Sequence, residues 1–131
     1  MTYKIFSFIF LIVGIVIGLG AFAHGLATQQ VHQALDRFPI DPHVGATIYV
    51  VWYFVSGCML LFGITIVWIW FRLRAGQTGL LFVAALIGLL YLATGVAGYI
   101  YLHGDPFMLF FAALGLLLLI SSYALRHVPG R

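Results

Sequence analysis

Charged residues are the scarcest class in this 131-residue chain, at 7% of the sequence. Three are acidic and six are basic, which is too few to cover the surface of a water-soluble domain. The basic residues form no dense patch, so nucleic acid is not an expected partner. The single cysteine, Cys58, excludes a disulfide within one chain and a CxxC redox pair.

Sequence patterns typical of catalysis are also missing. The chain has no recognisable nucleophile arrangement of serine, histidine and aspartate, no glycine loop that would cradle phosphate, and no pair of catalytic carboxylates. The interiors of its long apolar stretches hold no Asp, Glu, Lys, Arg or His, whereas proton-coupled pumps and exporters usually place such a residue there. These absences favour a protein without enzymatic activity and argue against a proton-coupled transporter.

Long apolar stretches are what the chain does have. Hydrophobic residues make up 64% of the sequence, and the mean hydropathy is +1.15. A hydrocarbon core about 30 Å thick needs roughly 20 helical residues per crossing. Four stretches reach that length, at about 5–24, 42–72, 79–103 and 106–126. The sequence predicts an all-α, multi-pass membrane protein in which residues 1–131 form one up-down bundle of four transmembrane helices.

The polar segment at about 28–38 has a different pattern. Val31, Leu35 and Phe38 recur at helical spacing among polar residues. Thr28 is expected to cap this helix and Pro39 to end it. We expect a short amphipathic helix lying on the membrane surface between the first two spans.

The start of the chain shares one feature with a signal peptide. The tripeptide Ala21-Phe22-Ala23 resembles a cleavage site between small residues. However, the apolar run from Ile5 to Ala23 exceeds the roughly 7–15 residues of a usual signal-peptide core. We therefore expect this run to be retained as the first span.

Basic residues are distributed unevenly along the chain. Five of the six lie at the two termini and in the middle turn: Lys4, Arg72, Arg74, Arg126 and Arg131. Cytoplasmic loops are enriched in lysine and arginine, so we expect both termini to be cytoplasmic in a plasma (inner) membrane. All three aspartates and four of the five histidines would then lie on the outer side: Asp36, Asp41, Asp105, His24, His32, His43 and His103.

Two matching corners stand at that outer side. The first and third apolar runs finish in His24-Gly25 and His103-Gly104, and the second and fourth begin after Asp41-Pro42 and Asp105-Pro106. These corners suggest a duplicated hairpin. One interpretation is structural, because glycine ends helices, histidine complements the negative helix end, and Asp-Pro starts the next helix.

The other interpretation is a ligand site. His24 and His103 would bind a cofactor at one depth, and the candidate metal ligands are His24, His103, Asp41, Asp105 and Met108. Imidazole with carboxylate suits zinc or copper(II), and a methionine favours copper(I). The two histidines would also suit the axial positions of haem b. A quinone or lipid headgroup near Tyr99 and Tyr101 is the third ligand class that stays open.

The favoured function is a small membrane protein without catalytic activity, acting as an accessory subunit or a ligand-binding module. The alternatives are a metal- or haem-binding protein, with a redox role for the metal, and a quinone- or lipid-binding protein. The glycine spacing in the first and third spans would let helices approach closely. Besides the lipid bilayer, the expected partners are therefore other membrane subunits or further copies of this chain, docked on these glycine-rich faces.

Overall fold

The computed structural model describes residues 2–127, and within this range the chain forms helices and the turns between them. The helices are α1 (Thr2–Leu26), α2 (Thr28–Leu35), α3 (Pro42–Arg74), α4 (Leu81–Tyr101) and α5 (Pro106–His127). Four helical stretches are long and apolar enough to cross a membrane. The first consists of α1 and α2 together, and the other three are α3, α4 and α5. The all-α prediction with four such helices is confirmed.

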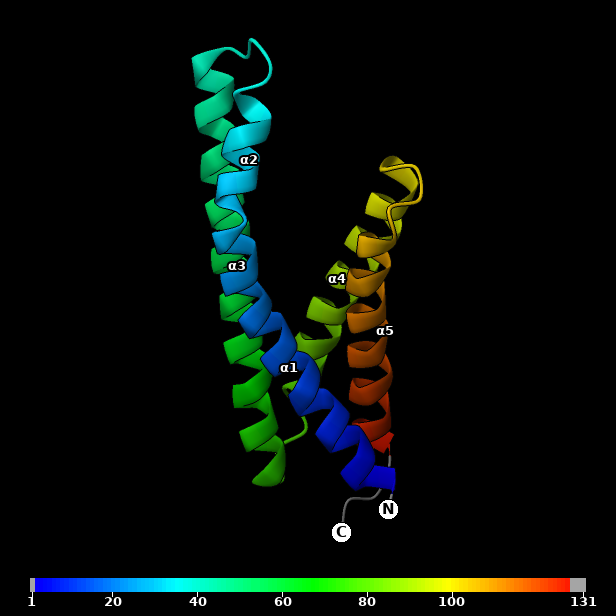
Figure 1. The fold of residues 1–131 in the computed structure, drawn as a ribbon. Helices are drawn as coiled ribbons and strands as arrows, with labels where there is room; N and C mark the ends of the chain where they lie inside the picture. The colour runs from blue at the N-terminus through cyan, green and yellow to red at the C-terminus, as the bar shows by residue number, and fades with distance from the viewer. Residues whose placement is uncertain (1, 128–131) are drawn as a thin grey trace.

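The helices form two hairpins rather than one evenly packed bundle. Helix α1 runs along α3, and α4 runs along α5 (Figure 1). Between the hairpins, α1 packs against α5, while α3 and α4 make few contacts. The start of α1, the α3–α4 turn and the end of α5 lie at one end, and the hairpins diverge towards the other end (Figure 1).

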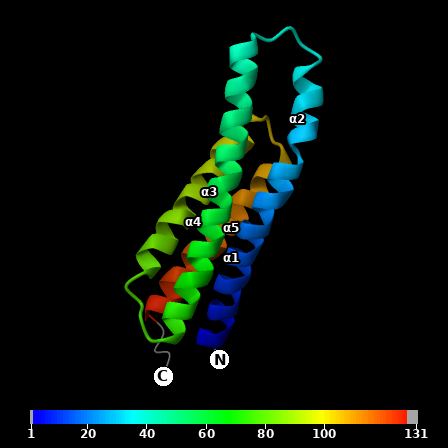
Figure 2. The same cartoon turned by 90° about the vertical axis from the view of Figure 1, so that its left-hand side faces the viewer.

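Helix lengths explain the uneven outline. Helix α3 has 33 residues and α4 has 21, so at about 1.5 Å per residue α3 is the longer by almost 20 Å. Figure 2 shows the start of α3, together with α2, projecting beyond the α4–α5 turn. The first hairpin is thus an arm that reaches past the second.

The buried core lies where the two hairpins meet. It contains Phe10, Val13, Ile17, Ile66, Ile69, Leu73, Leu81, Ala84, Ile87, Tyr91, Leu114, Leu118 and Leu125. These residues come from the first part of α1, the second part of α3, the first part of α4 and the second part of α5. Packing therefore joins the hairpins at one end and leaves the other ends apart.

Glycines allow the closest helix contacts. A Cβ atom built on Gly63 of α3 would lie 2.4 Å from the Cα atom of Gly18 in α1. A Cβ atom on Gly95 of α4 would lie 2.3 Å from the backbone nitrogen of Ala112 in α5. The glycine-rich faces therefore serve packing within this chain, and docking of other subunits on them stays a prediction.

Both Asp-Pro steps start helices as predicted. One Asp41 carboxylate oxygen accepts hydrogen bonds from the backbone N–H groups of His43 (2.8 Å) and Val44 (3.3 Å) at the start of α3. One Asp105 carboxylate oxygen accepts from the backbone N–H of Phe107 at 2.9 Å. Each carboxylate satisfies donors that the first helical turn leaves free.

The prediction of a corner at His24-Gly25 is wrong. Helix α1 continues to Leu26, and α2 follows after one residue, in the direction of α1 and alongside α3 (Figure 1). The predicted short helix is present as α2, and its place on the membrane surface stays a prediction. By contrast, His103 and Gly104 do end a helix, with left-handed φ angles of +54° and +94°. The two corners of the suggested duplication thus have different backbones.

The predicted capping role of Thr28 is also wrong. Its hydroxyl donates backwards to the carbonyl of Gly25 at 2.6 Å, while Ala27 occupies the N-cap position without a side-chain hydrogen bond. The carbonyl of His24 accepts from the Trp52 indole N–H at 2.9 Å. The carbonyl groups of His24 and Gly25 therefore both have hydrogen-bond partners. For this reason the chain needs no left-handed turn at the junction of α1 and α2.

Candidate functional site

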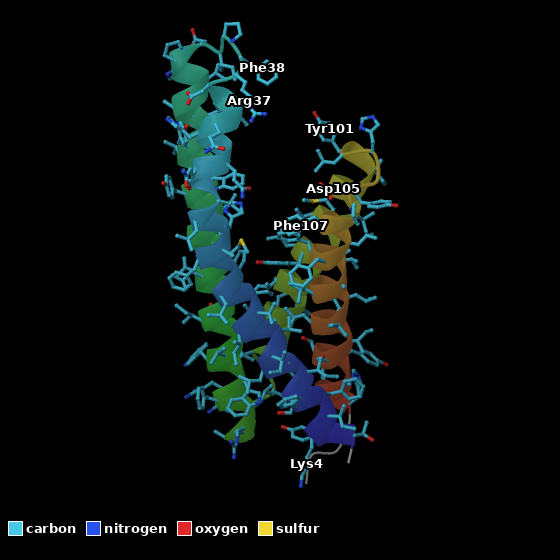
Figure 3. The ribbon with its side chains drawn as sticks, viewed as in Figure 1. Lys4, Arg37, Phe38, Tyr101, Asp105 and Phe107 are labelled. Atoms are coloured by element: carbon cyan, nitrogen blue, oxygen red, sulfur yellow. The ribbon has the colours of Figure 1, made fainter. Side chains whose placement is uncertain are left out.

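A cavity lies between the two hairpins, above the core. Its volume is about 330 Å³, and its walls come from all five helices: Val16, Ile17, Gly20, Ala23, His24, Ala27, Gln30, Trp52, Met59, Tyr91, Phe107, Phe110, Phe111 and Leu114. A second cavity of about 260 Å³ borders it at Met59, Tyr91 and Phe111 and extends between α3 and α4. Figure 3 shows Phe107 on the second hairpin, near the gap between the arms. The site is thus built where the hairpins diverge.

His24 supplies one polar wall of the cavity. Its ring stacks on the indole of Trp52, with 3.9 Å between ring centroids and 18° between planes. Its Nδ1 atom lies 2.8 Å from the hydroxyl oxygen of Ser56. These contacts to α3 hold the imidazole in one orientation.

The hydrogen bonds around Ser56 favour one tautomer of His24. The Ser56 hydroxyl oxygen lies 3.2 Å from the carbonyl of Trp52, to which it can donate its only proton. With the proton directed there, the hydroxyl oxygen accepts from His24, which corresponds to the tautomer with the proton on Nδ1. In the neutral ring, Nε2 is then left with a lone pair, ready to accept a hydrogen bond.

Tyr91 of α4 supplies a second polar group to the lining of this cavity. Its side chain is 5% exposed, and its hydroxyl has no hydrogen-bond partner among residues 2–127. The ring stacks on Phe111 at 5.9 Å and meets the edge of Phe62 at 6.4 Å. An unsatisfied buried hydroxyl costs about 1–3 kcal/mol. The aromatic contacts therefore hold a polar group that lacks a partner at the border of the two cavities.

The predicted metal ligands occupy other places. His103 is exposed at the end of α4, whereas Asp41 and Asp105 cap α3 and α5. Figure 3 shows Asp105 near the free end of the second hairpin. None of these residues, nor Met108, lines the cavity that contains His24.

Met108 has a packing role in this structure. A Cβ atom built on Gly98 would lie 2.6 Å from the Met108 sulfur, so the thioether fills the space above that glycine. Within residues 2–127, no three or more His, Cys, Asp and Glu side chains gather into a group that could hold a metal ion. A zinc, copper or haem b site at His24 and His103 stays a prediction without a supporting contact.

The remaining polar candidates lie away from the cavity. Tyr101 is 82% exposed at the free end of the second hairpin, and neither it nor Tyr99 lines the cavity (Figure 3). His32 bonds the hydroxyl of Tyr49 and lies 3.6 Å from the Asp36 carboxylate, both in an exposed region of the first arm. These residues form surface contacts rather than a shared site.

Sequence reasoning missed Trp52 and Tyr91. A signal for Tyr91 exists, because tyrosines of membrane helices concentrate at the two interfaces and this one stands in the middle of an apolar run. Trp52 has no comparable signal, since its contact with His24 depends on how α1 and α3 align. We compared the chain with known proteins, and no protein-family model, no curated protein and no solved structure matches it.

Proposed function

We propose that this protein is a membrane module without catalytic activity that binds a hydrophobic ligand with an oxygen-bearing ring, of the quinone class, in the cavity between its hairpins. The observation that carries the proposal is the buried Tyr91 hydroxyl, which has no partner among residues 2–127 and borders both cavities. A carbonyl oxygen of the ligand would accept from this hydroxyl and remove the cost of its burial.

His24, in the same cavity wall, suits the same ligand class. With the proton on Nδ1, its Nε2 atom would accept from a ring hydroxyl of the reduced ligand. Aromatic side chains line the space between these polar groups: Trp52, Phe107, Phe110 and Phe111. Flat aromatic walls favour offset stacking with a planar ring. A few polar groups in an apolar cavity are the usual composition of a small-molecule site.

The proposal includes a membrane orientation. The chain would cross a plasma (inner) membrane four times with both termini in the cytoplasm, because the basic residues Lys4, Arg72, Arg74 and Arg126 gather at the end where the hairpins join. Figure 3 places Lys4 at that end and Arg37 at the opposite tip. The cavity would then lie in the outer half of the bilayer. A ligand dissolved in the membrane would enter between the diverging hairpins.

The experiment is a titration of the detergent-purified protein with decylubiquinone, in which tryptophan fluorescence reports binding. Trp52 lines the cavity, so bound quinone is expected to quench its emission, and Trp52→Phe is expected to remove most of the saturable quenching. Tyr91→Phe removes one hydrogen bond, which is worth about 0.5–1.5 kcal/mol, and should raise the Kd roughly 3- to 10-fold.

The matched control is Tyr101→Phe, which removes the same atom from an exposed ring outside the cavity and should leave the Kd unchanged. Ala23→Phe places a large ring in the cavity wall and should abolish saturable quenching. Equal affinity in Tyr91→Phe and wild type would contradict the proposal. Displacement of the quinone by an equal concentration of phospholipid would instead favour a lipid as the ligand.

A further inference from the structure

A third cavity, of about 530 Å³, lies at the opposite end of the molecule, where the hairpins join. It is formed by the start of α4 and the end of α5, which Figure 2 shows beside each other. Its polar lining comes from Thr78, Ser122, Arg126 and His127, and Phe82 and Leu119 form part of its apolar wall. This cavity shares no residue with the proposed ligand site.

Ser122 is a buried polar group without a partner at this cavity. Its side chain is 3% exposed, and its hydroxyl makes no hydrogen bond to any residue in the described range 2–127. The adjacent Ser121 is equally buried, but its hydroxyl donates to the carbonyl of Leu117 at 2.6 Å. A serine in a helix normally satisfies itself in that way. Ser122 therefore retains a free donor that faces a cavity.

The start of α4 adds a positive helix end at the same place. Leu80 holds the N-cap position, and no side chain caps the helix there. The backbone N–H groups of Leu81 and Val83 donate to the carbonyls of Thr78 and Leu80, so the helix contributes its positive dipole end rather than a set of free donors. Such helix ends bind phosphate groups readily. The buried Ser122 hydroxyl lacks a hydrogen-bond partner among residues 2–127, which favours a ligand at this cavity independently of the helix end.

The charge of this end also favours an anion. Arg126 lines the cavity, and no ion pair between it and an acidic side chain occurs within residues 2–127. All three acidic residues of the chain, Asp36, Asp41 and Asp105, belong to loops or turns at the other end. Among residues 2–127, no acidic side chain therefore competes with an incoming anion at this cavity. An arginine guanidinium binds phosphate oxygens in a bidentate manner.

We propose that this cavity binds a phosphate group, held by the Ser122 hydroxyl and the Arg126 guanidinium beside the positive end of α4. The group would be carried by a phospholipid or be free in solution. The apolar wall at Phe82 and Leu119 would accommodate the first part of an acyl chain. A free phosphate would use only the polar groups.

Native mass spectrometry of the detergent-purified protein tests the proposal. In one arm, phosphatidylglycerol is titrated. In the other arm, inorganic phosphate is added up to millimolar concentration, once alone and once as a competitor of the lipid. For a lipid ligand, Ser122→Ala is expected to weaken the first bound phosphatidylglycerol roughly 3- to 10-fold. Arg126→Gln is expected to weaken it about 10-fold or more.

Two matched controls accompany these variants. Ser121→Ala removes a hydroxyl that is already bonded within α5, and Arg72→Gln removes an arginine that lies over Trp68, at 5.8 Å from the ring centroid. Both should bind as wild type does. Circular dichroism verifies folding, and Arg126→Lys replaces Arg126→Gln if the latter does not fold, with an intermediate affinity expected because charge remains without the bidentate geometry.

The outcomes separate the two sources of phosphate. Lipid binding that is lost in both variants and resists inorganic phosphate supports a phospholipid. Binding of inorganic phosphate alone, lost in the same variants, supports the phosphate site and assigns it to a free phosphate. Unchanged affinity for both ligands in Ser122→Ala and Arg126→Gln overturns the proposal.

Discussion

At the scale of single residues, the same amino acid has different roles at the two predicted corners. His24 is half-buried inside a helix, stacked on Trp52 and bonded to Ser56. His103 is exposed and adopts a positive φ of +54°, next to Gly104. A histidine at such a φ is typical of helix ends and turns. The structural interpretation therefore accounts for His103, while His24 belongs to the cavity.

The contact between Ser56 and His24 leads to a stability prediction. Ser56→Ala leaves the Nδ1 atom of His24 without its hydrogen-bond partner in a partly buried place, so we expect the free energy of unfolding to fall by about 1–2 kcal/mol. Thermal unfolding in detergent measures this change. Thr47→Ala is the control, because the Thr47 hydroxyl only bonds the carbonyl of His43 in its own helix and is exposed. An equal decrease in both variants would contradict the assigned role of Ser56.

The helix ends also show what a local pattern predicts well. Asp41-Pro42 and Asp105-Pro106 start helices because the carboxylate, the fixed φ of proline and the free N–H groups lie within four residues of each other. The continuation of α1 through Gly25 was not predictable in this way. It depends on Trp52, which is distant in sequence and donates to the carbonyl of His24.

At the scale of helices, glycines decide which faces meet. Gly14 and Gly18 of α1 face Ile66 and Gly63 of α3, and a Cβ atom at Gly14 would lie 2.7 Å from the Ile66 side chain. The spacing of Gly14 and Gly18 predicted close approach of a helix, but it did not identify that helix as α3. Which helix packs on this glycine face depends on how α1 and α3 align within the first hairpin.

A pair of glycine substitutions tests this packing. Gly63→Ala would place a Cβ atom 2.4 Å from the Gly18 Cα, so α1 and α3 must separate, at a cost of about 1–3 kcal/mol of unfolding free energy. Gly57→Ala is the matched control in the same helix, since nothing lies within 4 Å of its added Cβ atom. It should be neutral or stabilising by up to about 1 kcal/mol. Similar melting temperatures for the two variants would contradict the close contact.

At the scale of the whole molecule, the unequal hairpins determine where ligands can bind. Helices pack tightly at the end that contains the termini, and the arms separate beyond the middle (Figure 1). Since α3 and α4 make few contacts, the cavities around Tyr91 border the open side of the molecule. A closed four-helix bundle with the same sequence pattern would have filled this space with side chains.

Orientation in the membrane is the prediction at this scale. In a Cys58→Ala background, Gln33→Cys on α2 should react with a membrane-impermeant maleimide in intact cells. Gln77→Cys, in the α3–α4 turn, should react only after the membrane is permeabilised, because the proposed orientation puts that turn in the cytoplasm. Both side chains are exposed, so labelling depends on their side of the membrane. The reverse pattern would contradict the proposed orientation.

Composition and local pattern are enough to predict that the protein is helical, that four of its helical stretches are long and apolar enough to span a bilayer, and that two helices start at Asp-Pro steps. These properties depend on composition and on neighbours within one turn, which a linear pattern contains. The folded chain alone shows that His24 lines one cavity together with Tyr91 and that His103 does not. That pairing depends on the relative lengths of the helices and on the angle between the hairpins, and both arise from contacts between residues far apart in the chain.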